Sequence, residues 1–176
     1  ASEVESDNMK IAGLVCKNFN NGFSRVGGDS DLNAYFIEQN KVVISDVDTR
    51  AVVRHIRDKG AMNAIISTKD MDVAKLSEIL KKVPSMEGLE LSSAVSTSKS
   101  YFLGDKDSAI KIAVLDLGVK RNILQCMVNR GCYLKIFPMK SSYEEMKKWN
   151  PDGFFLSNGP GDPAAMPQVI EQVKKI

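Results

Sequence analysis

The chain has 176 residues, of which 43% are apolar and 26% are charged, and this composition is typical of a folded globular protein. Lys and Arg number 24 against 22 Asp and Glu, so the formal net charge of +2 argues against a dedicated nucleic-acid binder with a clustered basic patch. No apolar stretch reaches the length of a membrane span. The acidic, polar residues 1–7 predict neither a signal peptide nor a transit peptide.

The first half of the chain predicts short strands alternating with helices. Three apolar runs have the length of strands: residues 11–16, 42–44 and 62–66. Three helices are expected to begin at capping residues, which are Asp31, then Asp48 or Thr49, then Asp70. Their predicted ends are Asn40, Gly60 and Pro84. Residues 18–31, rich in Asn, Gly, Ser and Asp, predict a loop.

The second half is more regular. Three apolar runs again have strand length: residues 110–115, 133–137 and 154–156. A helical pattern over 119–128 and a capping box, Ser142-x-x-Glu145, fill the two intervals between them. A βαβαβ unit predicts a parallel sheet with right-handed crossovers. Because residues 104–109 look like a connector, we predict one domain over 1–105 and a second over 106–176.

The second half also contains a candidate ligand crevice. In an open parallel sheet, ligands bind beyond the carboxyl ends of the strands, where the strand order reverses. If the order is 2-1-3, the loop 116–118 meets the loop 157–163. Gly159 and Gly161 of the second loop lack a Cβ, so their N–H groups could approach a ligand closely and hold a developing oxyanion. An ordinary tight turn explains the same glycines, and that alternative stays open.

Few residues could serve a metal or a covalent mechanism. The three cysteines, Cys16, Cys126 and Cys132, form no C-x-x-C pair, which predicts neither a zinc site nor a disulfide framework. Their odd number suits a reducing cytoplasm. None lies in a strand-to-helix elbow, and the single histidine, His55, is better explained as a structural residue.

Other motifs that could bind a cofactor are also missing or weak. Asp46 and Asp48 lack the further ligands of a calcium loop, so a strand end followed by a helix cap explains them better. The glycine loop lacks the spacing of a dinucleotide fingerprint and the Lys of a P-loop. We therefore expect no metal and no nucleotide cofactor in this chain.

Several motifs resemble the small-subunit family of carbamoyl-phosphate synthetase. In the first half they are D-V-D-T-R at 46–50 and R-D-K-G-A-M-N at 57–63. In the second half they are D-L-G-V-K-R-N-I at 116–123, R-G-C at 130–132, N-P-D-G at 150–153 and L-S-N-G-P-G-D-P at 156–163. The resemblance extends from about Glu5 to the C-terminus.

The resemblance implies an α/β fold in two parts. Residues 1–105 would be the C-terminal part of the family's N-terminal α/β domain with a linker. Residues 106–176 would be the beginning, the first βαβαβ portion, of its flavodoxin-like class I glutamine amidotransferase domain.

The resemblance also implies a glutaminase, with L-glutamine as substrate. In the family a cysteine attacks the glutamine side-chain amide and releases ammonia, which passes to the large synthetase subunit. There the ammonia would react with bicarbonate and ATP, in the presence of Mg²⁺, to give carbamoyl phosphate for arginine and pyrimidine synthesis. By this resemblance Gly159 supplies an oxyanion-hole N–H and Gly161 contacts the bound glutamine, with no nucleic acid or membrane as partner.

The family's nucleophile lies in a G-x-C-x-G-x-Q elbow after the next strand, with His and Glu further on. The chain ends at Ile176, before these positions, so we expect a piece truncated at both ends and inactive alone, with no catalytic residue present. Three alternatives stay open: a non-enzymatic α/β interaction module, another class I glutamine amidotransferase, and a flavodoxin-like regulatory domain, for which no flavin loop is found.

Overall fold

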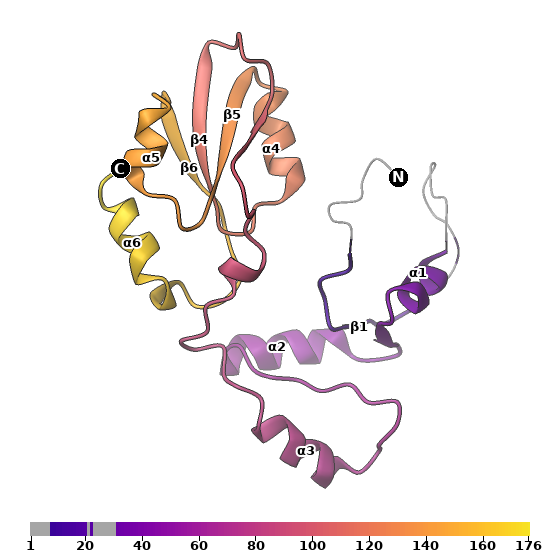
Figure 1. Cartoon of the computed structure of the whole chain (residues 1–176). Coiled ribbons are helices and arrows are strands. Elements are labelled where there is room, and N and C mark those ends of the chain that lie inside the picture. The colour runs from indigo at the N-terminus through magenta and orange to yellow at the C-terminus, as the bar shows by residue number, and fades with distance from the viewer. Residues whose placement is uncertain (1–7, 21, 23–30) are drawn as a thin grey trace. The chain divides into compact units, whose positions relative to one another are not determined.

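A computed structural model describes residues 8–20, 22 and 31–176 (Figure 1). The acidic segment 1–7 and most of the predicted loop 18–31 lie outside the described residues. The chain divides into two compact units, Ala1–Met86 and Glu87–Ile176. No helix in the described ranges is long and apolar enough to span a membrane.

The first unit contains a two-stranded parallel sheet and three helices. The strands are β1 (Gly13–Val15) and β2 (Val42–Ile44), and the helices are α1 (Leu32–Glu38), α2 (Thr49–Lys59) and α3 (Val73–Lys81). The predicted first two strands and first two helices are confirmed. Asp31 caps α1 by accepting the Ala34 N–H at 2.7 Å, and Asp48 caps α2 by accepting the Arg50 and Ala51 N–H groups, each at 3.1 Å.

The predicted strand over 62–66 is wrong. These residues pair with no neighbouring strand among the described ones, and an apolar run needs such a ladder to become a strand. Asn63 is instead fixed by its side chain, whose Nδ2 donates to the carbonyl oxygens of Val83 and Pro84, each at 3.0 Å. This segment is therefore tied to the chain that follows α3.

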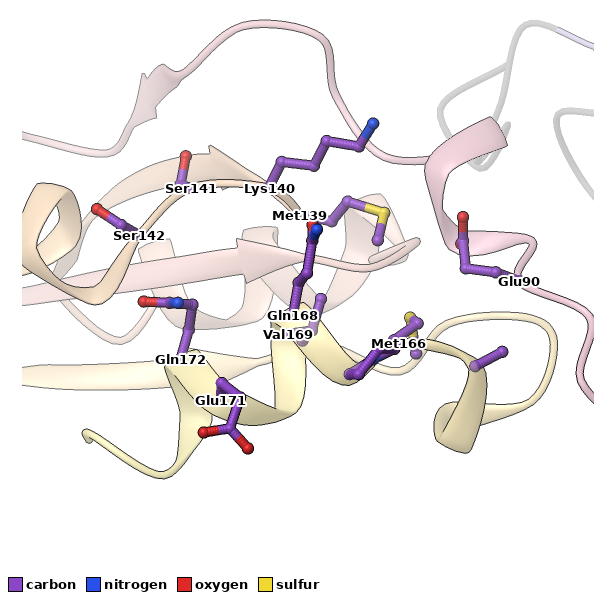
Figure 2. A pocket seen from close by; sticks show the side chains of 12 residues that line it. Glu90, Met139, Lys140, Ser141, Ser142, Met166, Gln168, Val169, Glu171 and Gln172 are labelled. Atoms are coloured by element: carbon purple, nitrogen blue, oxygen red, sulfur yellow. The ribbon is translucent and has the colours of Figure 1, made fainter.

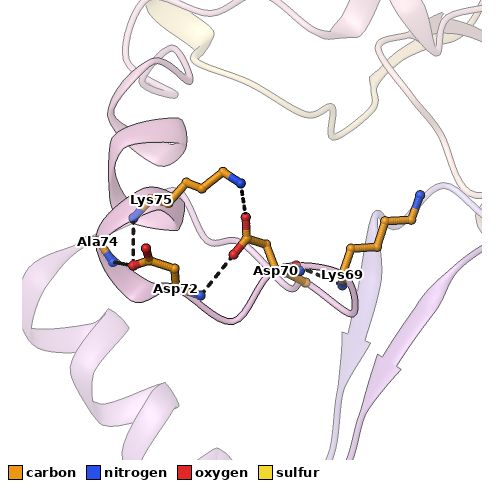
Figure 3. Close-up of polar contacts among 6 residues, drawn as sticks. Lys69, Asp70, Asp72, Ala74 and Lys75 are labelled. Carbon is orange, nitrogen blue, oxygen red and sulfur yellow. Dashed lines mark hydrogen bonds and ion pairs between the residues drawn. The ribbon is translucent and has the colours of Figure 1, made fainter.

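The predicted cap of α3 is also wrong, by two residues. Asp72, and not Asp70, accepts the first free N–H groups of the helix, from Ala74 at 2.9 Å and Lys75 at 3.3 Å (Figure 3). Asp70 accepts the Asp72 N–H at 3.1 Å and forms an ion pair with Lys75. The hydrogen bond from Lys75 is the main reason that the pKa of Asp70 is lowered. Both carboxylates thus fix the entry to the helix, but only the second caps it.

The second unit contains a four-stranded sheet in the order β3-β5-β4-β6. The strands are β3 (Tyr101–Leu103), β4 (Ile110–Asp116), β5 (Cys132–Pro138) and β6 (Gly153–Leu156), and the helices are α4 (Arg121–Val128), α5 (Tyr143–Lys148) and α6 (Pro167–Val173). Because β4 lies parallel between β5 and β6, these three strands have the 2-1-3 order on which the predicted crevice depends. The antiparallel edge strand β3, which pairs with β5, was not predicted, since three residues carry too little periodicity.

Helices cover both faces of this sheet (Figure 1). The strand residues on the two faces alternate, as expected of a pleated strand buried on both sides. One cluster packs with α5 and α6: Ala113, Leu115, Leu117, Phe137, Met139, Met146 and Val169. The other packs with α4: Val114, Leu124, Cys132, Leu134 and Ile136. Ser142 caps α5 as predicted, accepting the Glu145 N–H at 3.1 Å.

The second unit begins earlier than the predicted division at residues 105 and 106. Residues 87–103 are bound to the sheet and its loops: Gly88 donates to Asp162 at 2.9 Å, Thr97 donates to Asp116 at 2.7 Å, and β3 pairs with β5. Hydrogen bonds between residues far apart in sequence leave no signal in composition, so the small polar residues here resemble a linker. The assignment of 1–105 and 106–176 to two domains of the family stays a prediction.

Candidate functional site

The two loops of the predicted crevice meet at the carboxyl edge of the second unit's sheet. The loop after β4 begins at Leu117, whose N–H donates to the Ser157 Oγ at 2.8 Å. Ser157 is itself buried and opens the loop after β6. The strand order therefore brings together the residues that the sequence places 40 positions apart.

Asp116 fixes the first of these loops. Its Oδ1 accepts the N–H groups of Gly118 and Val119, each at 2.9 Å, and its Oδ2 accepts the Thr97 N–H at 2.7 Å. Asp116 is buried, and three hydrogen bonds compensate the loss of its hydration. The leading Asp of the D-L-G-V-K motif thus holds the turn between β4 and α4.

Gly159 is required by close packing. A Cβ at this position would lie 2.2 Å from the Leu117 carbonyl oxygen and 2.4 Å from the Ser92 Oγ. Any side chain would push the two loops apart or displace Ser92. The tight approach of the glycine loop to its neighbours therefore explains this residue without a ligand.

Gly161 is required for two reasons. Its φ of +91° lies in the region that favours glycine, and a Cβ would lie 2.4 Å from the Leu89 carbonyl oxygen. The N–H groups of Gly159 and Gly161 take part in no hydrogen bond among the described residues. Packing thus fixes both glycines and leaves both N–H groups available to a ligand.

A segment that the sequence did not single out, residues 88–97, lies against the glycine loop. The carboxylate of Asp162 accepts the N–H groups of Gly88 and Ala164, each at 2.9 Å, and the Asp162 N–H donates to the Leu89 carbonyl at 2.9 Å. The hydrogen bond from Gly88, followed by that from Ala164, lowers the pKa of Asp162. Only the small side chains of 92–98 could have indicated so close a packing.

A pocket of about 620 Å³ opens beside α6 (Figure 2). Met139 and Lys140, which follow β5, line one side, and Gln168 and Val169 of α6 line the other. Glu90 stands at one end, and its pKa is lowered mainly by hydrogen bonds from Ser93, with Lys140 adding a smaller electrostatic effect. Neither Gly159 nor Gly161 lines it, so it is separate from the predicted crevice.

The remaining candidates do not join the glycine loop. Cys132 is buried in the core of the second unit, and Cys126 is half-buried on α4. His55 is exposed on α2 and Cys16 follows β1, both in the first unit. Asp46 forms an ion pair with Lys17 at 3.6 Å. Among the described residues, no group of three His, Cys, Asp or Glu could hold a metal ion.

Two family models match the chain. The model of the carbamoyl-phosphate synthase small chain, CPSase domain, matches residues 1–66, and that of glutamine amidotransferase class-I matches residues 113–176. The second match contains both loops of the crevice.

Curated relatives match over nearly the whole chain. The carbamoyl phosphate synthase small chain of Salmonella typhi is 37% identical over 190 residues, covering 99% of this chain and 50% of that protein. Those of Escherichia coli K12 and Chlorobaculum tepidum are 36% and 35% identical, with 99% of this chain and 50% and 48% of those proteins covered. The chain thus spans about half the length of the curated relatives it matches. It belongs to the family of carbamoyl phosphate synthase small chains.

Proposed function

We propose that the chain supplies the glutamine-site loop of a class I glutamine amidotransferase, within the small subunit of a carbamoyl-phosphate synthetase. The observation that carries the proposal is the meeting of the loops 116–118 and 157–163 at the carboxyl edge of a parallel sheet. This is where open α/β sheets bind ligands, and it lies within the residues matched by the amidotransferase model.

The chemistry follows from the free N–H groups of the glycine loop. In the proposed reaction a cysteine thiolate attacks the side-chain amide carbon of glutamine, and the nitrogen leaves as ammonia after gaining a proton. Water then hydrolyses the thioester to glutamate. The Gly159 N–H would stabilise the oxyanion of the tetrahedral intermediate, and Gly161 would contact the bound glutamine. The Cys, His and Glu of the mechanism would come from residues beyond Ile176.

The proposal includes a partner. Ammonia would pass to a large synthetase subunit. There it would react with bicarbonate and ATP, in the presence of Mg²⁺, to give carbamoyl phosphate for arginine and pyrimidine synthesis in the cytoplasm. The relatives named small chains support a large partner. No cofactor is proposed for this chain itself.

Ammonia release from L-glutamine tests the proposal. We expect none from the 176-residue chain alone. We expect release once the chain is completed at both ends with the flanking parts of the Escherichia coli relative. A completed, folded protein that releases no ammonia would contradict the proposal. A glutamyl thioester trapped on Cys16, Cys126 or Cys132 would contradict the assignment of the nucleophile to residues beyond Ile176.

A second candidate, a non-enzymatic α/β module, is favoured by one observation. Packing alone accounts for both Gly159 and Gly161, as expected of a tight turn with no ligand. The two candidates differ in whether the Gly159 and Gly161 amide signals shift when L-glutamine is added to the ¹⁵N-labelled chain. A shift supports the glutamine site, and its absence favours the module.

A further inference from the structure

We propose that Ser92 is a positioning residue that sets the direction of the Gly161 N–H in the glycine loop. The inference rests on the proposed function for the identity of the ligand. The orientation of the loop itself is argued from contacts within the second unit.

Gly161 forms an antiparallel bridge with Glu90. The Asp162 N–H donates to the Leu89 carbonyl oxygen at 2.9 Å, so the bonds of the bridge come from the residues that flank the pair. In such a non-hydrogen-bonded pair, each residue points its own N–H and C=O away from the other strand. Gly161 therefore directs both groups away from residues 88–92.

Ser92 and the bridge together fix one of the two peptide planes on which this direction depends, because the Pro160 carbonyl flanks the bridged pair on the side of Leu91. Ser92 lies in the short 3₁₀ helix η1 (Ser92–Ala94), is 0% exposed, and its Oγ donates to the Pro160 carbonyl oxygen at 3.3 Å. The peptide between Pro160 and Gly161 is planar and trans, so its C=O and N–H point in opposite directions. Holding the carbonyl toward Ser92 aims the Gly161 N–H away from it.

The next peptide plane is fixed from the same segment. The hydrogen bond from the Asp162 N–H to the Leu89 carbonyl oxygen holds the peptide plane between Gly161 and Asp162. Because the Gly161 C=O points opposite to the Asp162 N–H in this plane, it lies on the same side as the Gly161 N–H, away from residues 88–92. Neither group is hydrogen-bonded within the described part of the chain. A donor and an acceptor side by side suit a ligand that offers the complementary pair, such as a primary amide or the α-amino acid group of glutamine.

Ser92 is itself held firmly. Its carbonyl accepts the N–H groups of Ser96 at 2.8 Å and Val95 at 3.2 Å. The Ser96 Oγ accepts the Met139 N–H at 3.0 Å, which ties the segment to the end of β5. The hydroxyl of Ser92 is thus presented to the loop from a segment bound to the sheet.

The experiment compares Ser92→Ala with Ser93→Ala in the ¹⁵N-labelled 176-residue chain. Ser93 lies in the same short helix but is exposed, and its hydrogen bonds go to Glu90 and not to the glycine loop. The residual dipolar coupling of the Gly161 N–H reports the direction of that bond. We expect it to change in Ser92→Ala and to stay at the wild-type value in Ser93→Ala, with the couplings of β4 and β5 unchanged in both.

Titration with L-glutamine gives the functional readout. Loss of one hydrogen bond of about 1 kcal/mol predicts affinity about fivefold weaker in Ser92→Ala, with wild-type affinity in Ser93→Ala. Ser92→Cys keeps a weak donor at the same position and should recover part of both effects. It also provides a second variant if Ser92→Ala fails to fold.

The two readouts separate the two proposals. An unchanged Gly161 coupling in a folded Ser92→Ala variant would overturn the role of Ser92, whether or not glutamine binds. Unchanged glutamine affinity in that variant, with binding by the wild type, would do the same. A changed coupling in a chain that binds no glutamine would support the role of Ser92 and count against the proposed function.

Discussion

The two units of the chain differ in how they bury apolar residues. In the second unit, β4 and β5 are seven residues long and are covered by helices on both faces, and Leu134 and Ile136 are 0% exposed. In the first unit, Phe36 is the one buried apolar residue among those described, and Val73 of α3 is 78% exposed. Both units show regular apolar periodicity, so periodicity alone does not establish a core.

The difference follows from the sheets. Each strand of the first unit has three residues, which offer few side chains for helices to cover. Hydrophobic stabilisation is about 25 cal/mol per Å² of apolar surface removed from water. Most of the free energy of folding from burial therefore comes from the second unit, and substitutions should show this.

The largest effect is expected from Leu134→Ala. Leu134 is fully buried against α4, and deleting such a side chain leaves a cavity that costs about 3–5 kcal/mol. The measurement is urea unfolding followed by the fluorescence of Trp149, the single tryptophan, which packs against the other core cluster of the same unit.

The matched control is Leu32→Ala in α1. Leu32 is 42% exposed, so the same chemical change should cost the first unit far less, as measured by amide hydrogen exchange across α1. If the two substitutions cost the same free energy, the contrast between the units would be wrong.

Sequence reasoning succeeded where the signal was local or strongly periodic. The caps Asp31, Asp48 and Ser142 and the strands of the βαβαβ unit are of this kind. It failed where pairing decides the structure. Residues 62–66 have no strand partner in the part of the chain that the structure describes, and β3 is identified only by its ladder with β5.

The candidate site shows the same limit. The glycine loop could be predicted because the glycines themselves indicate it in the sequence. The role of Ser92 could not, because it depends on the Pro160 carbonyl, which lies 68 residues away in sequence. The catalytic roles of Gly159 and Gly161 stay predictions.

The second prediction concerns the loop that the second unit's sheet positions. Gly159→Ala places a Cβ 2.2 Å from the Leu117 carbonyl oxygen, and because the obstacle is backbone, the loop must shift at a cost of about 1–3 kcal/mol. Gly153→Ala is the matched control, since a Cβ there has no heavy atom within 4 Å. Urea unfolding should show a lower midpoint for Gly159→Ala only. Equal midpoints would mean that the loops do not pack this closely.

The third prediction tests the first unit. Asp72→Ala removes the cap of α3 and should cost that helix about 1 kcal/mol, measured as faster hydrogen exchange of the α3 amides. Asp70→Ala removes an ion pair of an exposed lysine and the hydrogen bond from the Asp72 N–H, but no cap of the helix, so it should cost α3 less. A larger effect from Asp70→Ala would restore the capping role that the sequence first suggested.

The smallest effect is expected from acidification. It acts on the two hydrogen bonds that join Asp162 to Gly88 and Leu89, here called the Asp162 latch. Hydrogen bonds from Gly88 and Ala164 lower the pKa of Asp162 below its ordinary value of 3.8. A carboxyl whose pKa is lower in the folded state stabilises that state fully above the unfolded value, and loses this contribution as the pH falls through the folded value. The Gly88 and Ala164 amide signals should therefore titrate together at a pH below 3.8, while the core amides of β4 keep their shifts.

Asp162→Asn, which cannot ionise, should abolish the shared titration, because no charge is left to lose. Titration of the Gly88 amide at or above pH 3.8 would show that the latch does not favour the ionised carboxylate.

The first unit offers a parallel in Asp70, whose pKa is lowered mainly by a side chain, Lys75. Added salt should therefore weaken the Asp70 ion pair more than the Asp162 latch, because an exposed ion pair is screened while short hydrogen bonds from backbone N–H groups are screened less.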